Sequence, residues 1–266
     1  MSYAGKSIII TGASDGIGAE IARQLAAEHP RLTLAARSAD RLESVAAECR
    51  SRGAEVETVT ADVALDSNCQ RIVDAALTRF GAVDVLIANA GVSMHARFDE
   101  ITEFSTFERL WRINCLGTIQ CVRHAWDPLK ASRGQIVGVS SLAGKTGVPG
   151  RTTYCASKFA QAGFLDALRI EAEDYGIDVS AVYPGVVATE IRRNGLNGAG
   201  QPAGTSGLEE RGAMTVDECA RQIIKTMRAR RRELVMTPRA RLGLWLKLLA
   251  PALVDRMARA ALARNH

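Results

Sequence analysis

Several features that would place this chain of 266 residues in a specialised class are absent from its sequence. The six cysteines form no C-x-x-C pair and several lie in apolar runs, so we expect buried free thiols and a reducing cytosol rather than a disulfide framework. The N-terminal segment MSYAGKSIII lacks the charged stretch, long apolar stretch and cleavage site of a signal peptide. The four histidines are dispersed without metal-ligand spacing, and Ser140-Ser141 lie in no G-x-S-x-G turn. Neither a metal site nor acyl-enzyme chemistry is therefore predicted.

The charge of the chain is unevenly distributed. The formal net charge is +5, but residues 221–266 hold 12 Lys or Arg against only Glu233 and Asp255, so the first 220 residues are acidic on balance. A basic tail on an acidic body is not the pattern of a nucleic-acid-binding domain, and no motif of that kind accompanies it. No nucleic-acid partner is predicted, whereas the tail suits a membrane surface or another protein.

Short β-rich runs alternate with longer helical patterns along the chain. The expected strands are 7–11, 32–36, 56–60, 83–88, 135–140, 177–183 and 233–236, and the expected helices are 16–28, 39–52, 67–80, 104–130, 152–175 and 216–230. Continuous apolar runs of this length suit strands that are buried on both faces. The alternation predicts an α/β fold, with a single doubly wound, Rossmann-type domain whose parallel sheet has about seven strands and helices on both faces.

Residues 1–238 are expected to form this domain, and residues 239–266 an apolar and basic helical extension. Within the domain, 191–213 hold six glycines and a proline with few large apolar residues, which is typical of a flexible loop. In the extension, Pro251 is expected to separate two short helices.

The first expected strand leads directly into the sequence TGASDGIG at 11–18 and then into a helix. Glycines at 12, 16 and 18 allow a tight turn and the close approach of a pyrophosphate to the free amides at the helix N-terminus. The spacing G-x-x-x-G-x-G differs from the usual dinucleotide fingerprint, and a purely structural turn looks similar. Alone, the motif is weak evidence for a dinucleotide.

The end of the second expected strand indicates which dinucleotide. NAD-binding proteins commonly carry Asp or Glu here, whereas this chain has Arg37 and Ser38 after Ala36. A guanidinium can hold a 2′-phosphate that a carboxylate would repel, so NADP(H) is favoured over NAD(H). The alternative is that Arg37 is only solvated and Ser38 only caps the next helix. Asp15, inside the glycine turn, is a mild argument against the phosphate role, because its negative charge would oppose a phosphate.

Tyr154 and Lys158 lie four residues apart on an expected helix, so their side chains emerge on one face. A phenol is a poor base at neutral pH, and a nearby ammonium lowers its pKa. The pair alone is common by chance. Thirteen residues before Tyr154, however, Ser141 ends the strand in IVGVSSLAG.

Together these motifs resemble the short-chain dehydrogenases/reductases over about residues 5–190. In order and at family spacing, the motifs are TGASDGIG at 11–18, Asp62-Val63, Asn89-Ala90-Gly91, Asn114 in NCLG, Ser141, YCASK at 154–158 and PGVVAT at 184–189. The family commonly has Asn at the position of Ala88, which is a minor departure.

The resemblance implies four catalytic residues. Ser141 is expected to hydrogen-bond the substrate oxygen, and Tyr154 to exchange a proton with it as hydride moves. Lys158 is expected to lower the tyrosine pKa and bind the nicotinamide ribose. Asn114 is expected to bend its helix and hold a water in a proton relay. The expected cofactor-binding residues are Gly12, Ser14, Asp15, Gly16, Ile17, Gly18, Arg37, Ser38, Asp62, Val63, Asn89, Ala90, Gly91, Tyr154, Lys158, Pro184, Gly185, Val187 and Thr189.

The stretches RSADRL, VSSLAGK and YCASKFA look most like the 11β-hydroxysteroid dehydrogenase and 3-ketosphinganine reductase branch, which acts on steroids and long-chain lipids. We therefore expect an apolar carbonyl or alcohol substrate. A 3-oxoacyl reductase and a non-catalytic cofactor-binding regulatory protein are the alternatives. The family is commonly oligomeric, so a homodimer or homotetramer is expected.

The segment from Leu242 to Val254 is nearly all apolar but too short to span a bilayer, which needs about 20 residues. Three interpretations of the tail compete. Residues 239–262 either lie on the inner face of a membrane, cover an apolar substrate cleft or form a subunit interface.

Overall fold

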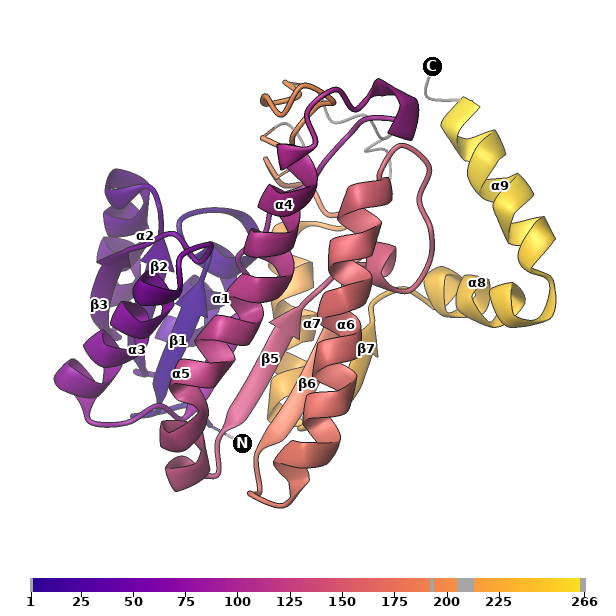
Figure 1. The fold of residues 1–266 in the computed structure, drawn as a ribbon. Coiled ribbons are helices and arrows are strands. Elements are labelled where there is room, and N and C mark those ends of the chain that lie inside the picture. Colours follow the sequence, from indigo (N-terminus) through magenta and orange to yellow (C-terminus); the bar gives the residue numbers. More distant parts are fainter. Residues whose placement is uncertain (1, 192–193, 205–212, 264–266) are drawn as a thin grey trace.

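The structure is a computed structural model that describes residues 2–191, 194–204 and 213–263 (Figure 1). Its seven strands form one sheet in the order β3-β2-β1-β4-β5-β6-β7, in which every neighbouring pair is parallel. The strands are β1 (Ser7–Thr11), β2 (Arg31–Ala36), β3 (Glu55–Thr60), β4 (Val85–Ala88), β5 (Gln135–Val139), β6 (Asp178–Tyr183) and β7 (Glu233–Val235). The predicted doubly wound, parallel α/β fold is confirmed.

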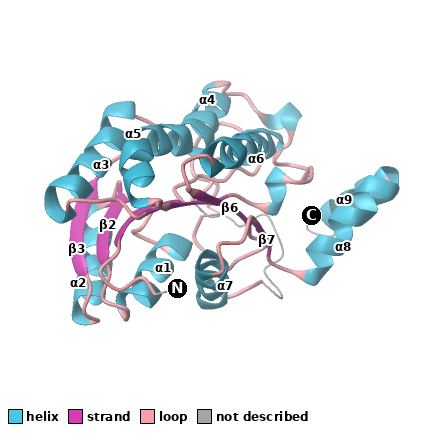
Figure 2. Ribbon diagram, turned by 90° about the horizontal axis from the view of Figure 1, so that it is seen from below, coloured by secondary structure: helices cyan, strands magenta, loops and turns pink. Residues whose placement is uncertain are grey.

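Helices cover both faces of the sheet (Figure 2). One layer contains α1 (Gly16–Ala26), α2 (Ala39–Ser51) and α7 (Val216–Arg228), and the other contains α3 (Asp66–Phe80), α4 (Ser105–Trp111), α5 (Gly117–Ser132) and α6 (Thr152–Glu173). Because side chains alternate along a strand, Ile8 and Ile10 enter the core under the first layer and Ile9 enters the core under the second. All six cysteines are buried free thiols, as predicted.

From β1 the chain runs through β2 to β3 toward one edge of the sheet. After β3 it returns to β4, on the other side of β1, and continues through β5 and β6 to β7 at the other edge, so the strand order reverses between β1 and β4. The crevice at such a reversal, at the carboxyl ends of the strands, is where α/β sheets bind ligands. The segments after β1, β2, β3 and β4 all begin at that edge, so the topology brings the predicted motifs together.

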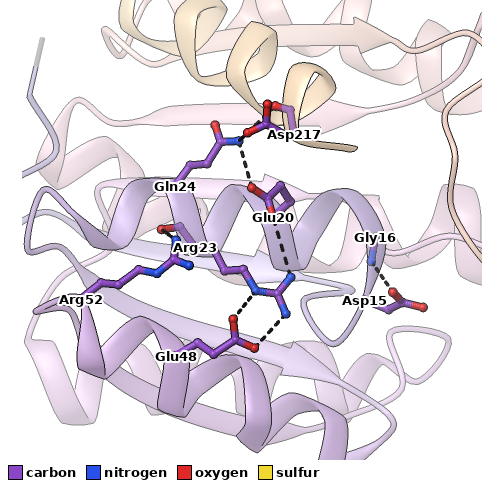
Figure 3. A network of polar contacts seen from close by, with 8 residues as sticks. All are labelled: Asp15, Gly16, Glu20, Arg23, Gln24, Glu48, Arg52 and Asp217. Atoms are coloured by element: carbon purple, nitrogen blue, oxygen red, sulfur yellow. Dashed lines mark hydrogen bonds and ion pairs between the residues drawn. The ribbon is translucent and has the colours of Figure 1, made fainter. Parts of the chain in front are cut away.

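Polar contacts fix α1, the helix that follows the glycine turn, between its two neighbours (Figure 3). Arg23 holds Glu48 of α2 with two hydrogen bonds of 2.7 and 3.1 Å. On the other side, Gln24 Nε2 donates to the Asp217 carboxylate of α7 at 2.9 Å. These partly exposed contacts add little stability each. Together they tie the last turn of α1 to α2 on one side and to α7 on the other.

The segment expected as one helix at 104–130 is helical but not uniform. Between α4 and α5 the backbone forms a π-helical turn, Arg112–Leu116, and Asn114 lies at its centre. Such a turn widens the helix by one residue and is frequent at functional sites. Apolar periodicity does not reveal it, because the flanking turns keep the same buried face.

The C-terminal extension forms α8 (Pro238–Leu249) and α9 (Pro251–Ala263), with Pro251 at the start of the second helix, as predicted. Ala240 and Leu244 of α8 pack against the core beside β7. In Figures 1 and 2 the two helices extend from one side of the sheet. No described helix combines the length and apolarity needed to cross a membrane.

The described part of the glycine-rich loop packs on the segment that follows β4. Leu196 N donates to Ser93 O at 2.9 Å, and Thr102 N donates to Gly198 O at 3.0 Å. The Leu196 side chain is buried. The remainder of the loop, 192–193 and 205–212, lies outside the described residues.

Candidate active site

A cavity of about 510 Å³ lies at the carboxyl edge of the sheet. Thirteen of the residues predicted to bind the cofactor line it: Gly12, Ser14, Asp15, Gly16, Ile17, Arg37, Ser38, Asp62, Val63, Asn89, Ala90, Gly91 and Thr189. Six predicted residues do not line it: Gly18, Tyr154, Lys158, Pro184, Gly185 and Val187. The cavity is therefore built from the segments after β1, β2, β3, β4 and β6.

The glycine turn is shaped by close backbone contacts. Gly12 has φ +66°, and a Cβ atom there would lie 2.8 Å from Ala90 Cα. At Gly18, a Cβ atom would lie 2.4 Å from Gly12 O and 2.5 Å from Asn89 Nδ2. Gly18 is thus explained by the packing of α1 against the turn, and Gly12 by the turn itself. Asn89 Nδ2 closes the arrangement by donating to Thr11 O at 3.0 Å.

The charged groups beside the turn include one that the sequence analysis missed. Asp15 caps α1, because its Oδ1 accepts from Gly16 N at 2.6 Å. Arg41, in the first turn of α2, lines the cavity, and its Nη1 lies 3.8 Å from Asp15 Oδ2. Its Nε donates to Ser38 Oγ at 3.3 Å, and the Ser38 side chain does not cap α2. Arg41 follows Ser38 by three residues, a helical spacing that would have indicated it.

The segment after β3 lines the cavity through a tight turn. Asp62 Oδ1 accepts from Ala64 N at 3.0 Å, so the carboxylate is held by its own backbone. Val63 is buried against α5, where a Cβ atom at Gly117 would meet Val63 Cγ2 at 2.8 Å. This close contact places Val63 with one side on the helix and the other on the cavity.

The two adjacent serines after β5 have different surroundings. Ser140 is buried, and its Oγ donates to Lys158 O of α6 at 3.4 Å. Ser141 is only partly buried, and its Oγ accepts from Ala143 N at 3.2 Å. Alternation at the strand end thus sends Ser140 into the protein and leaves Ser141 nearer the surface.

Tyr154 lies in the first turn of α6, where it is 8% exposed. The carbonyl of Tyr154 accepts from Ser157 Oγ at 2.8 Å, and Ser157 Oγ accepts in turn from Asn114 Nδ2 at 3.0 Å. Asn114 also exchanges two hydrogen bonds with the backbone of Val92, at 2.8 and 2.9 Å. The π-helical turn therefore connects the segment after β4 to the turn of α6 that carries Tyr154.

Lys158, one turn later, is 3% exposed. Its Nζ donates to Val139 O at 3.1 Å and to Gln161 Oε1 at 3.0 Å. Burial lowers the pKa of this ammonium to about 8, because desolvation disfavours the charged form. Gln161, fully buried and bonded to Thr118 Oγ1 at 2.9 Å, is a second residue missed by the sequence analysis. Its position three residues after Lys158 was the available signal.

Gly91 links the cavity to this buried group. A Cβ atom on Gly91 would lie 3.2 Å from Asn114 Oδ1 and 3.6 Å from Lys158 Nζ. Gly91 also lines the cavity, so both side chains lie beside the backbone of a cavity-lining residue. Two of the predicted catalytic residues, Asn114 and Lys158, therefore lie next to the cavity at Gly91, whereas Ser141 and Tyr154 do not line it.

The segment after β6 covers the other side of the glycine turn. Thr189 Cγ2 lies 3.3 Å from the position of a Cβ atom on Gly16. Pro184 O accepts from Leu142 N at 2.9 Å, which ties this segment to the residue after Ser141. Val187 is buried and pairs with Met214 in a short parallel bridge. These residues hold Thr189 over the cavity.

A parallel α/β sheet with a cavity at its carboxyl edge, lined by a glycine turn at the N-terminus of a helix, is the architecture of nicotinamide-dependent oxidoreductases. The sequence matches the short chain dehydrogenase family over residues 6–198. The chain belongs to this family of oxidoreductases, the short-chain dehydrogenases/reductases, which use a nicotinamide cofactor.

Similar proteins span several kingdoms. A dehydrogenase/reductase SDR family protein 7-like from Dictyostelium discoideum is 32% identical over 260 residues, which are 96% of this chain and 81% of that protein. The 11-beta-hydroxysteroid dehydrogenase-like 4A of Arabidopsis thaliana is 39% identical over 184 residues, 69% of this chain and 61% of that protein. This match spans about three fifths of the plant protein. An alcohol dehydrogenase from the archaeon Thermococcus sibiricus, solved with 5-hydroxy-NADP, has a TM-score of 0.75 at 30% identity, over 87% of this chain and 95% of that one.

Proposed function

We propose that the protein is an NADP(H)-dependent oxidoreductase that transfers hydride between nicotinamide and a carbonyl or secondary alcohol of an apolar, steroid- or lipid-like substrate. The observation that carries this proposal is that Gly91, which lines the cavity, lies beside the side chains of Asn114 and Lys158. In this proposal residues 1–238 bind the cofactor and carry out the reaction, and residues 239–266 attach the protein to a membrane surface or to another subunit.

The residues around the cavity fit a dinucleotide. The side-chain-free backbone at Gly12 and Gly16 leaves room for a pyrophosphate at the N-terminus of α1. Arg37 and Arg41 supply cationic donors at the far end, and Gly91 lies beside Lys158 at the near end. When bound, the nicotinamide supplies or accepts the hydride.

Side chains of this protein transfer the proton to and from the substrate oxygen. In the reducing direction Ser141 Oγ donates a hydrogen bond to the substrate oxygen and fixes its position. Tyr154 Oη gives that oxygen a proton, and it removes the proton in the oxidative direction. With a pKa of about 8, Lys158 is largely an ammonium at neutral pH, so it favours the phenolate form of Tyr154. Asn114 holds the backbone on which both side chains depend.

Preference for NADP(H) is supported by two guanidinium groups at the end of β2. Arg37 and Arg41 both line the cavity there. Asp15, whose charge would oppose a 2′-phosphate, has its carboxylate near the Arg41 guanidinium and bonded to the α1 backbone. The local balance therefore favours an additional anion.

Arg37→Ala is expected to weaken NADP(H) binding by about 1.5–3 kcal/mol, the range for hydrogen bonds to charged groups, and to leave NAD(H) binding unchanged. Arg41→Ala is expected to act in the same direction, because it also removes the cation facing Asp15. Fluorescence titration with both reduced cofactors measures the effect. Arg123→Ala, an exposed arginine of α5 that does not line the cavity, is the matched control. Equal losses for both cofactors would show that the two arginines do not read the phosphate.

An apolar substrate is supported by the names of relatives, which include 11-beta-hydroxysteroid dehydrogenases. A 3-oxoacyl reductase remains the alternative enzyme, and a cofactor-binding regulatory protein the alternative without turnover. A screen of steroid, long-chain and acyl-thioester carbonyls with NADPH, and of the matching alcohols with NADP⁺, separates the three. Turnover of apolar ketones is expected. Folded, NADPH-binding protein that turns over none of them would favour the regulatory role.

We include a homo-oligomer of two or four subunits and a cytoplasmic location in this proposal. An apolar groove of about 360 Å³ between α4 and α6 supports the oligomer. Phe104, Phe107 and Trp111 line it, and its rim includes both Glu108 and Arg112. A rim with both signs of charge can complement itself across a twofold axis.

A further inference from the structure

The helical pair formed by α8 and α9, here called the C-terminal hairpin, has one face that is anchored to the catalytic domain. Ala240 and Leu244 of α8 pack against the core. One turn further, Lys247 Nζ donates to Lys145 O at 2.9 Å and lies 5.5 Å from the centre of the Phe159 ring. The anchored face thus contacts the segment between Ser141 and Tyr154. Positions 240, 244 and 247 lie on one side of a helix.

The opposite face of the hairpin is apolar and exposed. On α8, Leu242 is 70%, Trp245 67%, Leu248 75% and Leu249 84% exposed. On α9, Leu253 and Met257 are also exposed, at 38% and 52%. The described parts of this chain leave these large apolar side chains uncovered, and soluble monomers rarely expose so many of them together. Such a face indicates a partner.

The charges around the exposed face are almost all of one sign. Five basic residues and one acidic residue, Asp255, lie between 238 and 263. Arg239 and Arg241 lie beside the apolar positions of α8, where Arg241 Nε also donates to Val235 O at 2.9 Å, and Arg256 and Arg259 lie beside those of α9. An apolar face bordered by Arg, with Trp245 among the exposed side chains, matches the chemistry of an anionic lipid surface.

The same charges disfavour a second copy of this chain as the occupant. A twofold interface places a surface against itself, so the arginines around the hairpin would meet arginines. The groove between α4 and α6 has no such conflict, because Glu108 and Arg112 both border it. The charges around the hairpin therefore suit an anionic surface, whereas the charges around the groove suit a second copy of this chain.

We propose that the exposed face of the C-terminal hairpin docks on an anionic phospholipid surface. Leu242, Trp245, Leu248 and Leu249 enter the interface between headgroups and acyl chains, while the arginines bind phosphate or carboxylate headgroups. The helices lie on the surface and do not cross it, because the apolar run from Leu242 to Val254 has only thirteen residues, one of them Lys247. The Lys247–Lys145 contact holds the catalytic domain to the docked hairpin.

Co-sedimentation of the full-length protein with vesicles tests the proposal. Vesicles of phosphatidylcholine with phosphatidylserine are expected to carry down the protein, and vesicles of phosphatidylcholine alone much less. Higher salt is expected to weaken binding without abolishing it, since salt screens the arginines and not the apolar burial. Trp245 emission is expected to shift to shorter wavelength on binding, and Trp245→Phe is expected to remove that shift while Trp111 and Trp126 remain.

Matched variants separate the hairpin from general surface effects. Leu248→Glu with Leu249→Glu is expected to reduce vesicle binding at least tenfold. Ile170→Glu is the control, because Ile170 on α6 is equally exposed, at 74%, but lies outside the hairpin. Both proteins are expected to keep wild-type turnover of a water-soluble ketone and the wild-type sedimentation coefficient, because the altered side chains are exposed.

Two outcomes would overturn the proposal. One is equal vesicle binding by the hairpin variant and the Ile170→Glu control. The other is a wild-type protein that binds no vesicles and a hairpin variant that dissociates into smaller species in sedimentation velocity, which would assign the face to another subunit. Neither outcome bears on the proposed oxidoreductase function, which the ketone assay reports separately.

Discussion

Tyr154→Phe is expected to lower kcat by on the order of 10²–10⁴-fold, the contribution of a positioned general acid and base. The substitution removes only the hydroxyl oxygen, and the phenyl ring keeps its packing in the first turn of α6, where the side chain is 8% exposed. The hydrogen bonds that position this turn use the carbonyl of Tyr154 and the side chains of Ser157 and Asn114, which the variant retains. The fold and the cofactor cavity are therefore expected to persist.

Steady-state rates with the best ketone from the substrate screen measure this effect, and NADPH titration and thermal unfolding serve as controls. NADPH affinity within twofold of the wild type, together with lost turnover, would assign the loss to the proton transfer. Tyr175→Phe is a matched control, because Tyr175 is exposed and lies just after the end of α6. A Tyr154→Phe protein that keeps most of its kcat would refute the proposed mechanism.

The sequence was sufficient for the sheet because most strands are short apolar runs between polar turns, the edge strand β3 (EVETVT) being the exception. It was also sufficient for most of the cavity, since the motif residues Gly12, Asp62, Asn89 and Thr189 occur directly after strands whose carboxyl ends meet at one edge. Where chemistry depends on the end of a strand, sequence order already implies proximity.

Residues that act across two elements were harder to predict. Arg41, in α2, lies beside Asp15 of the glycine turn, and Gln161 links Lys158 of its own helix to Thr118 of α5. Gly18 was expected to contact the cofactor, and the structure explains it by the close approach of Gly12 O and Asn89. A motif specifies residue types and spacing, whereas these contacts depend on how the helices pack.

The C-terminal hairpin shows the same limit on a larger scale. The apolar run from Leu242 to Val254 predicts a buried or membrane-bound surface but does not say which side of the helix is covered. The packing of Ala240 and Leu244 on the core, with Leu249 left exposed, supplies that information. The structure thus distinguishes the side of α8 that is anchored to the domain from the side that is exposed, which the apolar run alone does not.

Lys158→Met is expected to lower kcat by about 10–1,000-fold at neutral pH, because an adjacent cation commonly lowers the pKa of an acid by about 1–3 units. The same substitution is expected to change how stability depends on pH in the cofactor-free protein. Burial lowers the pKa of Lys158 from 10.5 to about 8, so the native state releases its proton at lower pH than the unfolded chain. Between these two values the unfolded state binds more protons, and wild-type stability therefore rises with pH.

Lys158→Met removes this dependence. As the pH rises from 7.5 to 10, the free energy of unfolding of the wild type is therefore expected to increase relative to that of the variant. At about 1.4 kcal/mol per pH unit, the full interval from 10.5 to about 8 corresponds to roughly 3 kcal/mol. Urea unfolding of both proteins across this pH range measures the difference. Lys225→Met, which removes an exposed lysine of α7, controls for the loss of a charge at the surface. Parallel pH profiles for the wild type and Lys158→Met would show that the buried ammonium is not titrated early, and the assignment of Lys158 as a poised charge beside Tyr154 would then fail.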